Sequence, residues 1–310
     1  MMRIAALEFR LQFQQGGDLR PWFGPVLRGG FGAILRSLSC GLRERSCLSC
    51  VLAPRCAYGY LFETPMLSEI EPGTVFHAPH PFYWKPPLLD EIKDPETVSL
   101  GLTLVGHALE YYPYFVLGLQ QLGERGLGKD RLPFKILSIE CKRTGSLLPS
   151  DRLLPEQSIF TLDPLQQCSA SEDQTSKFRI IMKTPLRLRS KGQRLFHFNF
   201  YSLVSSVVRR VELLGKWHCD VDLLRRFTHL IELAPKVQLI SDNSYFYDWT
   251  RYNKRQDQTM PIGGSLGEVT LEGQFGLFSG LFAAAEYIGA GNQTSFGLGQ
   301  VKFEGVSNPS

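Results

Sequence analysis

The chain contains the same local arrangement twice: an apolar helical stretch, a glycine-rich loop and a strand-like segment. The first copy occupies residues 118–140 and the second occupies residues 275–304. Their Gly-Leu-Gly sequences, at 126–128 and 297–299, lie 171 residues apart in a chain of 310 residues. Glycine adopts positive φ and lets another backbone approach closely, so each loop is expected to be able to hold a phosphate backbone. Two copies in matching contexts indicate a duplicated unit.

The length suits two domains of about 150 residues, each large enough to have its own hydrophobic core. No run reaches the roughly 18 consecutive apolar residues of a membrane span. The N-terminus lacks the continuous apolar stretch of a signal peptide. We therefore expect a soluble, cytoplasmic protein without a membrane partner.

Positive charge is concentrated in two regions, although the net charge of the whole chain is only +4. Residues 1–60 hold eight arginines against three acidic residues, and residues 177–226 hold twelve Lys and Arg against three. The stretch 140–176 is acidic, with six acidic residues against three basic ones. Clustered positive charge suits a polyanion, because neutralising phosphates releases condensed counterions. The alternative is that these are ordinary solvated surfaces.

The first half has the pattern of a ferredoxin-like domain. Residues 3–14 alternate between apolar and polar side chains, which predicts a strand with one buried face. From Pro21 the apolar residues recur every three or four positions, which predicts a helix. A strand-like segment at 98–104, a helix ending near Leu122 and a strand at 133–139 follow. The order strand, helix, strand, strand, helix, strand is typical of that fold.

The second half begins with a strand of alternating apolar and basic residues at 177–189. Its apolar positions predict a buried face and its basic positions an exposed face, while Pro185 requires an edge strand or a bulge. The apolar set is Phe178, Ile180, Met182, Leu186 and Leu188, and the basic set is Lys177, Arg179, Lys183, Arg187 and Arg189. A helix at 200–214, strand-like segments around 236–252 and 266–272, and the helix 275–288 repeat the order of the first half.

These patterns predict an α+β protein with two tandem ferredoxin-like (RRM-like) domains, each with a glycine-rich loop before its last strand. The N-terminal domain is predicted to span residues 1–145, with a cysteine loop inserted at 40–56. Residues 146–176 lack a pattern and are predicted to be a linker. The C-terminal domain, predicted to bind RNA through its basic strand, spans 177–310.

Four of the seven cysteines fall within 17 residues, at Cys40, Cys47, Cys50 and Cys56. Cys47-Leu-Ser-Cys50 is a CxxC knuckle that can bring two thiolates to one metal ion, and the outer two cysteines would complete a tetrahedral set. We predict a structural zinc site that braces this loop. An iron–sulfur cluster and free thiols are the alternatives.

The chain resembles the CRISPR-associated repeat-processing endoribonucleases of the RAMP superfamily, which cut precursor CRISPR RNA within each repeat. The resemblance rests on several stretches taken together and in order: Pro25–Gly32, Gly106–Tyr114, Gly126–Arg131, Thr184–Arg189, Trp249–Asn253, Gly263–Val269 and the C-terminal glycine loop. It implies tandem ferredoxin-like domains, with CRISPR repeat RNA held by the second glycine loop and the cleft between the domains. A CRISPR effector complex and a second copy of the chain are further partners to consider.

The resemblance implies cleavage without a catalytic cofactor. The ribose 2′-OH attacks its own phosphate and leaves a 2′,3′-cyclic phosphate and a 5′-OH. This reaction needs a base, a proton donor and positive charge near the phosphorane. Many members carry a catalytic histidine in or just after the first helix, whereas the first histidine here is His77. We predict a catalytic set around the segment 76–85 with tyrosine as a further proton donor: His77, His80, Lys85 and Tyr58.

The RNA-binding residues are predicted in three groups. The first is the basic strand face, with Lys177, Arg179, Lys183, Arg187 and Arg189. The second is a segment that interleaves cations with aromatic residues, and it contributes Arg251, Lys254 and Arg255. The third is the second glycine loop, whose backbone N–H groups and short polar side chains suit phosphates: Gly289, Gly291, Asn292, Thr294, Ser295, Gly297 and Gly299.

Two other functions fit the same sequence. A non-catalytic RNA-binding RAMP subunit of an effector complex would bind repeat RNA without cutting it. A zinc-braced scaffold that binds protein partners would show no salt-dependent affinity for RNA, whereas both RNA functions predict a steep salt dependence.

Overall fold

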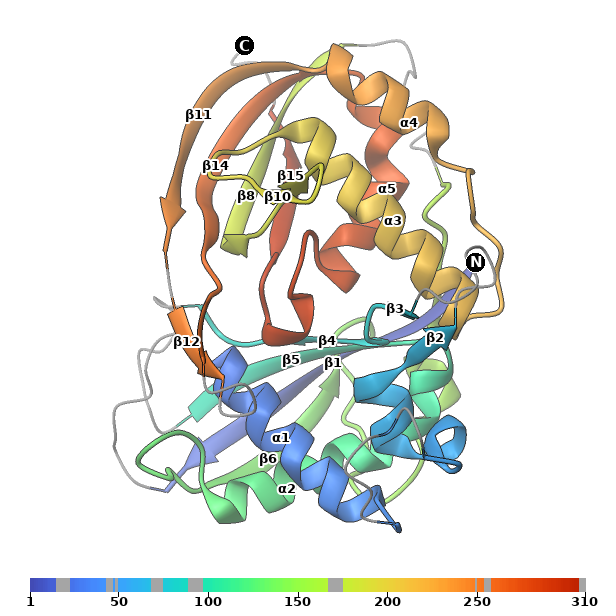
Figure 1. Cartoon of the computed structure of the whole chain (residues 1–310), viewed down its shortest axis with the longest axis vertical. Helices are drawn as coiled ribbons and strands as arrows, with labels where there is room; N and C mark the ends of the chain where they lie inside the picture. The colour runs from blue at the N-terminus through green and yellow to red at the C-terminus, as the bar shows by residue number, and fades with distance from the viewer. Residues whose placement is uncertain are drawn as a thin grey trace. The chain divides into compact units, whose positions relative to one another are not determined.

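The computed structural model describes residues 1–14, 23–42, 47, 50–67, 75–88, 97–166, 175–248, 250–253 and 258–306. The described chain divides into two compact units (Figure 1). The N-terminal unit comprises Met2–Thr161 together with Leu213–Asp220, and the C-terminal unit comprises Leu162–Glu212 and Val221–Ser310. No described helix is both long enough and apolar enough to cross a bilayer.

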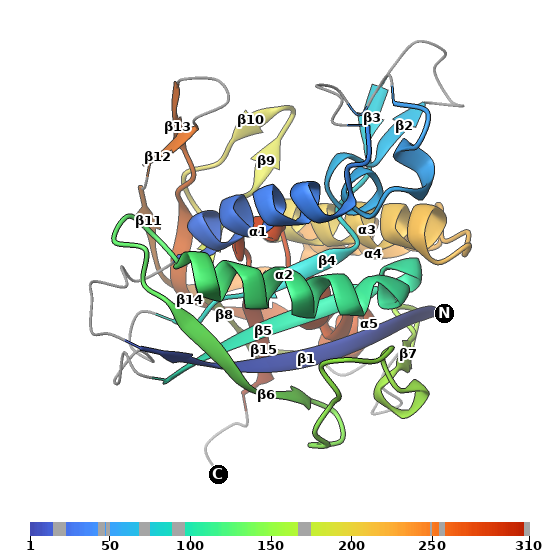
Figure 2. The same ribbon diagram turned by 90° about the horizontal axis from the view of Figure 1, so that it is seen from below.

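The N-terminal unit has the predicted ferredoxin-like order. Its strands β1 (Met2–Phe13), β4 (Phe82–Lys85), β5 (Thr97–Val105) and β6 (Phe134–Cys141) form an antiparallel sheet in the order β4-β5-β1-β6. The helices α1 (Gly24–Ser39) and α2 (Tyr112–Arg125) lie side by side on one face of this sheet (Figure 2). Smaller elements are β2 (Pro65–Leu67), β3 (Val75–His77), β7 (Phe160–Leu162) and helical turns at Ala53–Arg55, Gly59–Glu63, Gly106–Tyr111 and Glu156–Ser158.

Glycine in the middle of α1 allows close packing in the N-terminal core. A glycine inside a helix costs about 1 kcal/mol relative to alanine, so its presence needs a reason. A Cβ atom on Gly32 would lie 2.8 Å from the Phe62 ring. The absence of that Cβ lets Phe62 pack beside α1, where its ring also contacts Phe31 at 6.0 Å and Phe82 at 5.2 Å between centroids.

The C-terminal unit repeats the topology. Its sheet runs β11-β14-β8-β15, with β8 (Ser176–Leu186), β11 (Gln238–Tyr247), β14 (Gly264–Gly273) and β15 (Val301–Gly305) all antiparallel. The helices α3 (Phe200–His218) and α5 (Phe275–Ile288) cover one face of it (Figure 1). Smaller elements are β9 (Arg189–Ser190), β10 (Gln193–Arg194), β12 (Thr250–Asn253), β13 (Gln258–Pro261), α4 (Thr228–Leu233) and helical turns at Ala234–Lys236 and Thr294–Phe296. Both sheets thus confirm the predicted tandem ferredoxin-like fold.

The predicted alternation in β8 is confirmed. Each of its predicted apolar positions is at most 2% exposed, and Phe178 contacts Phe200 of α3 and Phe282 of α5. Because β8 lies between β14 and β15, Pro185 is not at an edge. The register between β14 and β8 instead shifts between Ser265 and Gly267, opposite the segment that holds Pro185. The bulge interpretation is therefore the correct one.

The structural boundary between the units lies later in the chain than the predicted domain boundary at 145. Strand β7 pairs with β1, and the N-terminal unit extends to Thr161. Residues 162–166 belong to the C-terminal unit, and the remainder of the predicted linker up to 174 lies outside the described residues.

Candidate functional site

The second glycine loop is folded against the end of β8. Asn292 donates from its backbone N–H to the Arg187 carbonyl at 2.9 Å and from its side-chain amide to the same oxygen at 3.2 Å. The Gly299 N–H donates to the Pro185 carbonyl at 3.2 Å. A Cβ atom on Gly299, whose φ is +72°, would lie 1.8 Å from the Ala290 carbonyl oxygen. The loop therefore has a shape that only a glycine at 299 permits.

Thr184 connects this loop to the bulge in β8. Its side chain is 1% exposed, and its hydroxyl donates to the Gly297 carbonyl at 2.9 Å while accepting the Gln300 N–H at 2.9 Å. One side chain next to the bulge thus hydrogen-bonds to two backbone groups of the loop. Thr294 and Ser295, predicted as polar donors to RNA, are only 5% and 6% exposed. The backbone of the loop is held by the protein itself.

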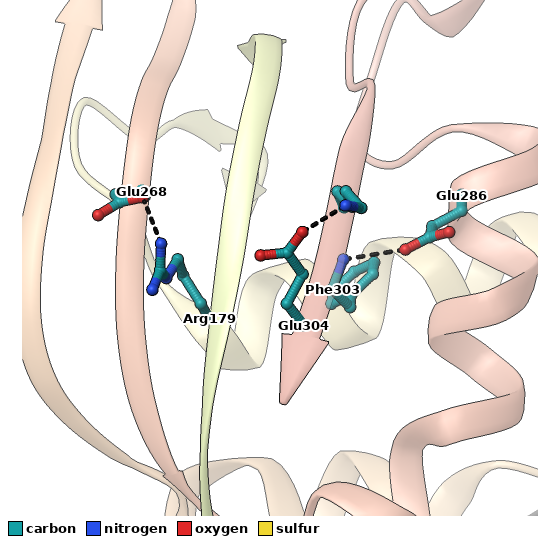
Figure 3. Close-up of polar contacts among 6 residues, drawn as sticks. Arg179, Glu268, Glu286, Phe303 and Glu304 are labelled. Carbon is teal, nitrogen blue, oxygen red and sulfur yellow. Dashed lines mark hydrogen bonds and ion pairs between the residues drawn. The ribbon is translucent and has the colours of Figure 1, made fainter. Parts of the chain in front are cut away.

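The basic face of β8 lies beside carboxylates from neighbouring strands (Figure 3). The Arg179 guanidinium is 3.5 Å from the Glu268 carboxylate of β14, and Lys302 and Glu304 of β15 form a second ion pair. Lys177 is opposite Glu272 in the register between β8 and β14. The sheet face is therefore less positive than β8 alone predicts, because β14 supplies Glu268 and Glu272, whereas the ion pair on β15 adds no net charge. Lys183 is exposed on the same face.

The remaining predicted RNA contacts lie beyond the end of β8 or outside the described side chains. Arg187 is half-buried, and its guanidinium donates to the Gln293 amide oxygen at 3.4 Å. Arg189 is exposed in β9. Arg251 lies in β12, of which only the backbone is described, while Lys254 and Arg255 lie outside the described residues.

Of the predicted catalytic residues, His80 has the most informative surroundings. Its Nε2 atom is 3.0 Å from a guanidinium nitrogen of Arg28, which projects from α1. A guanidinium can only donate, so Nε2 is the acceptor and the neutral ring carries its proton on Nδ1. The imidazole is stacked on Phe82 at 5.6 Å between centroids, and the Arg28 guanidinium lies 5.0 Å from the centre of the Phe62 ring.

Tyr58 lies in the same cluster. Its ring stacks on Phe62 at 5.5 Å, with an interplanar angle of 6°, and its hydroxyl donates to the Glu63 carboxylate at 2.9 Å. Phe62 is thus the common neighbour of Tyr58, Arg28 and His80. The Tyr58 side chain is 6% exposed, so it packs within the N-terminal core.

Of the other two predicted catalytic residues, only Lys85 has a described side chain. Lys85 ends β4, and its ammonium group is 5.6 Å from the centre of the Tyr83 ring. His77 lies in β3 opposite Pro65, and only its backbone is described. The sequence analysis did not select Arg28 as a site residue. Its position off the apolar stripe of the first helix was the only signal, and contact with a residue 52 positions later cannot be inferred from one helix.

Two further histidines have structural partners in the N-terminal unit. His218 is fully buried, with Nε2 3.0 Å from the Pro79 carbonyl oxygen and Nδ1 2.8 Å from the Tyr60 hydroxyl. Because the carbonyl accepts, Nε2 carries the proton and Tyr60 donates to Nδ1. Burial raises the pKa of Tyr60, which keeps its hydroxyl protonated. His107 pairs through Nε2 with Asp220 at 2.7 Å.

The predicted zinc site is not supported. Among the described residues, which include all four predicted ligands, no group of three or more His, Cys, Asp or Glu side chains is placed to hold a metal ion. The Cys56 thiol points to the Ser39 carbonyl at 3.6 Å, and Cys47 packs against the hydrophobic core. Burial is the largest cause that raises the pKa of the Cys47 thiol. Cys40 and Cys50 are partly exposed and unbridged.

Comparisons with known proteins cover both halves of the chain. Residues 2–163 match the family model AF_1859_N, described as an N-terminal domain, and residues 180–301 match the family of the CRISPR-associated endoribonuclease Cas6. An uncharacterized protein of Archaeoglobus fulgidus is 27% identical over 139 residues, which are 44% of this chain and 46% of that protein. The matched region thus spans less than half the length of this curated relative.

Solved structures resemble the chain over nearly its whole length. A Cas6 product complex has a TM-score of 0.58 at 17% identity and covers 97% of this chain and 99% of its own. Thermus thermophilus Cas6 has a TM-score of 0.55 at 16% identity and covers 98% and 99%. A partial Cas6-RT-Cas1–Cas2 complex has a TM-score of 0.58 at 14% identity and covers 98% of this chain and 46% of that one.

At these low identities the structural similarity establishes the fold alone. The relationship to known families comes from the family-model matches. The AF_1859_N match covers more than half of the chain, and the Cas6 match covers most of the C-terminal unit. The resemblance inferred from the sequence is confirmed. The chain belongs to the family defined by the AF_1859_N N-terminal domain, and its residues 180–301 match the model of the CRISPR-associated endoribonuclease Cas6.

Proposed function

We propose that the protein is a metal-independent endoribonuclease that binds CRISPR repeat RNA and cleaves precursor CRISPR RNA by 2′-OH attack. The match of residues 180–301 to the Cas6 endoribonuclease family carries this proposal. The products would be a 2′,3′-cyclic phosphate and a 5′-OH end. DNA has no 2′-OH and would not react.

His80 is the residue of the predicted catalytic set that best suits the general base. In its contact with Arg28 the Nε2 atom of His80 is the acceptor, so the lone pair that a general base needs is on this atom. When a phosphodiester binds, the guanidinium pairs with phosphate oxygens and releases Nε2 to accept the 2′-OH proton. The same guanidinium then stabilises the charge that develops on the phosphorane. Lys85 and Tyr58 stay predicted proton donors for the departing 5′ oxygen.

The first test is incubation of the purified protein with labelled repeat RNA from its own locus, in EDTA. A matched RNA carries a single 2′-deoxy nucleotide at the cut site. We expect cleavage in EDTA and no cleavage of the deoxy RNA. Tight binding of both RNAs without cleavage would support the non-catalytic RAMP subunit instead, which is the alternative that the absence of a histidine before His77 favours.

The base is tested by His80→Ala. We expect the cleavage rate to fall by about 10²- to 10⁴-fold, the usual contribution of general base catalysis, with RNA affinity unchanged. His229→Ala, at an exposed position of α4, is the control and should cleave at the wild-type rate. A His80→Ala protein that cleaves normally would remove His80 from the mechanism and leave the reaction itself intact.

A further inference from the structure

A small hairpin beyond β8 places arginines close together. Strands β9 and β10 are joined by Lys191 and Gly192, whose φ angles of 48° and 79° are typical of a two-residue type I′ turn. In this hairpin Arg189 and Arg194 are direct cross-strand partners. Like charges directly opposite each other destabilise a sheet. The pairing is therefore unfavourable for folding alone, which points to an anionic ligand.

Arg187 adds a third guanidinium to the same place. Burial, and after it the neighbouring charges of Arg194 and Arg189, lowers the pKa of Arg187. Asp248 offsets one of the three charges, since its carboxylate is 3.3 Å from the Arg194 guanidinium and is largely exposed. A net positive charge remains on these four side chains, beside the second glycine loop that is bonded to Arg187.

An exposed aromatic ring completes this surface. The Arg194 guanidinium lies 4.5 Å from the centre of the Phe246 ring and 5.2 Å from that of Phe196, and the two rings are 5.1 Å apart. The Arg194 side chain is 15% exposed, and its Nε atom is buried without a hydrogen-bond partner among the described residues. In contrast, Phe196 is 63% exposed. Arg194 and Phe246 thus hold Phe196 in place while much of its ring surface faces solvent.

We propose that Phe196 is a stacking site for one unpaired base of the RNA, whose adjacent phosphates contact Arg187 and Arg189. Arg194 is a positioning residue that fixes the Phe196 ring from behind. An aromatic face next to clustered guanidinium groups is the combination by which proteins hold single-stranded nucleic acid. The base must be unpaired, because the faces of bases inside a duplex are covered by their neighbours. This inference rests on the proposed function, since it names a subsite for the same RNA.

The test compares Phe196→Ala with Phe196→Trp, which keeps an aromatic face. Tyr201→Ala removes another exposed aromatic side chain, from α3 of the same unit, and is the control. Binding of labelled repeat RNA is measured by fluorescence anisotropy at several salt concentrations, after thermal unfolding has shown that each variant is folded. We expect Phe196→Ala to weaken binding about 5- to 150-fold, the range for one stacked base. Phe196→Trp and Tyr201→Ala should bind within about twofold of the wild type.

The salt dependence separates stacking from phosphate contact. Phe196→Ala should leave the slope of log affinity against log salt unchanged, because no phosphate contact is lost. Arg189→Met should reduce that slope by about one. A changed slope in Phe196→Ala would overturn the division of roles proposed here.

The stacked base is identified with repeat RNAs that each carry one abasic nucleotide. The RNA that is abasic at the stacked position should bind the wild type and Phe196→Ala equally weakly. Removing either the ring or the base abolishes the same stacking contact. Equal losses from Phe196→Ala at every position, or wild-type affinity for Phe196→Ala, would overturn the stacking site. Either result would leave the proposed function standing if the wild type still cleaves repeat RNA in EDTA. A wild type that neither binds nor cleaves would end both proposals.

Discussion

The two glycine loops follow equivalent helices, yet they use their glycines differently. In the first loop Leu127 and Leu132 exchange backbone hydrogen bonds of 2.8 and 2.9 Å, which closes a short hairpin. A Cβ atom on Gly128 would meet nothing within 4 Å. In the second loop Gly299 is pressed against Ala290. The close backbone contact of the first loop is at Gly126 instead, where a Cβ atom would lie 2.1 Å from the Arg131 carbonyl oxygen. The two Gly-Leu-Gly sequences therefore differ at their last glycine, which is free in the first loop and crowded in the second.

The largest effect is expected from substituting these two glycines by alanine. Both have positive φ, at +82° for Gly128 and +72° for Gly299, so backbone strain of about 1–2 kcal/mol is common to both variants. Only Gly299→Ala adds a clash with a backbone oxygen at 1.8 Å. We expect Gly128→Ala to lower the free energy of unfolding by about 1 kcal/mol and Gly299→Ala by on the order of 4 kcal/mol or more. Urea unfolding of the full chain measures both.

If both glycine variants lose the same free energy of unfolding, the proposed difference between Gly128 and Gly299 is wrong. If Gly299→Ala shows no cooperative unfolding transition, limited proteolysis of the purified variant provides a second measurement. We expect cleavage within the C-terminal unit and protection of the N-terminal unit, whereas uniform cleavage would show that the effect is not confined to this loop.

A second pair of variants compares buried threonine hydroxyls. Thr184 in the C-terminal unit and Thr103 in the N-terminal unit are each 1% exposed. The Thr184 hydroxyl makes two hydrogen bonds, whereas the Thr103 hydroxyl has no partner among the described residues. We expect Thr184→Val to lower the free energy of unfolding by about 2 kcal/mol, because it removes both hydrogen bonds, including the one to the buried Gly297 carbonyl. Thr103→Val should be neutral or stabilising by up to about 1 kcal/mol.

Thermal unfolding of both valine variants provides the measurement. Valine has nearly the same shape as threonine, so packing changes little at either site. A Thr103→Val protein as destabilised as Thr184→Val would show that the Thr103 hydroxyl has a partner, such as a bound water. A neutral Thr184→Val would remove the argument that this hydroxyl holds the loop to β8.

The smallest effect is expected from the charges on the two sheets. Arg179 and Glu268 pair on the C-terminal sheet, and Lys142 and Glu8 pair at 3.1 Å in the N-terminal unit. Both pairs are partly exposed to solvent, so neutralising either glutamate should change stability by less than about 1 kcal/mol. RNA affinity separates them. If repeat RNA contacts the β8 face, Glu268→Gln should raise the affinity several-fold at low salt, and Glu8→Gln should not.

An affinity that is unchanged in Glu268→Gln would move the RNA away from this sheet face. Arg179→Met gives the reciprocal measurement, since it should weaken binding if Glu268→Gln strengthens it. The prediction holds only if the two variants change the RNA affinity in opposite directions.

Alternation in the sequence predicted which side chains of β8 are buried, but not the charge of its exposed face. The period of two assigns Phe178 and Ile180 to the core whatever the neighbouring strands contain. The carboxylate that meets Arg179 comes from a residue 89 positions away. Its approach depends on the register between β8 and β14, which a local pattern cannot supply. The predicted basic surface was therefore correct in composition and overstated in net charge.

The candidate catalytic group shows the same limit. The segment around His80 was selected from residue types, and the structure adds the guanidinium that faces it. The cysteine spacing suggested metal ligands because a CxxC knuckle permits them. Spacing cannot show where the other thiols point, and Cys56 points to Ser39. Burial that follows from a short sequence period is thus predicted well. Contacts between residues that are distant in the sequence are not.

The membership of residues 213–220 bears on how such proteins can exchange parts. Helix α3 begins in the C-terminal unit, but residues 213–220, which include its last turns, are packed with the N-terminal unit. They bring the buried His218 into that unit. A single crossover near residue 161 would therefore separate Tyr60 from its imidazole partner. Recombination between homologous genes would preserve this contact only with matched residues at 213–220, or with two further breakpoints. The duplicated units are thus less interchangeable than their shared topology implies.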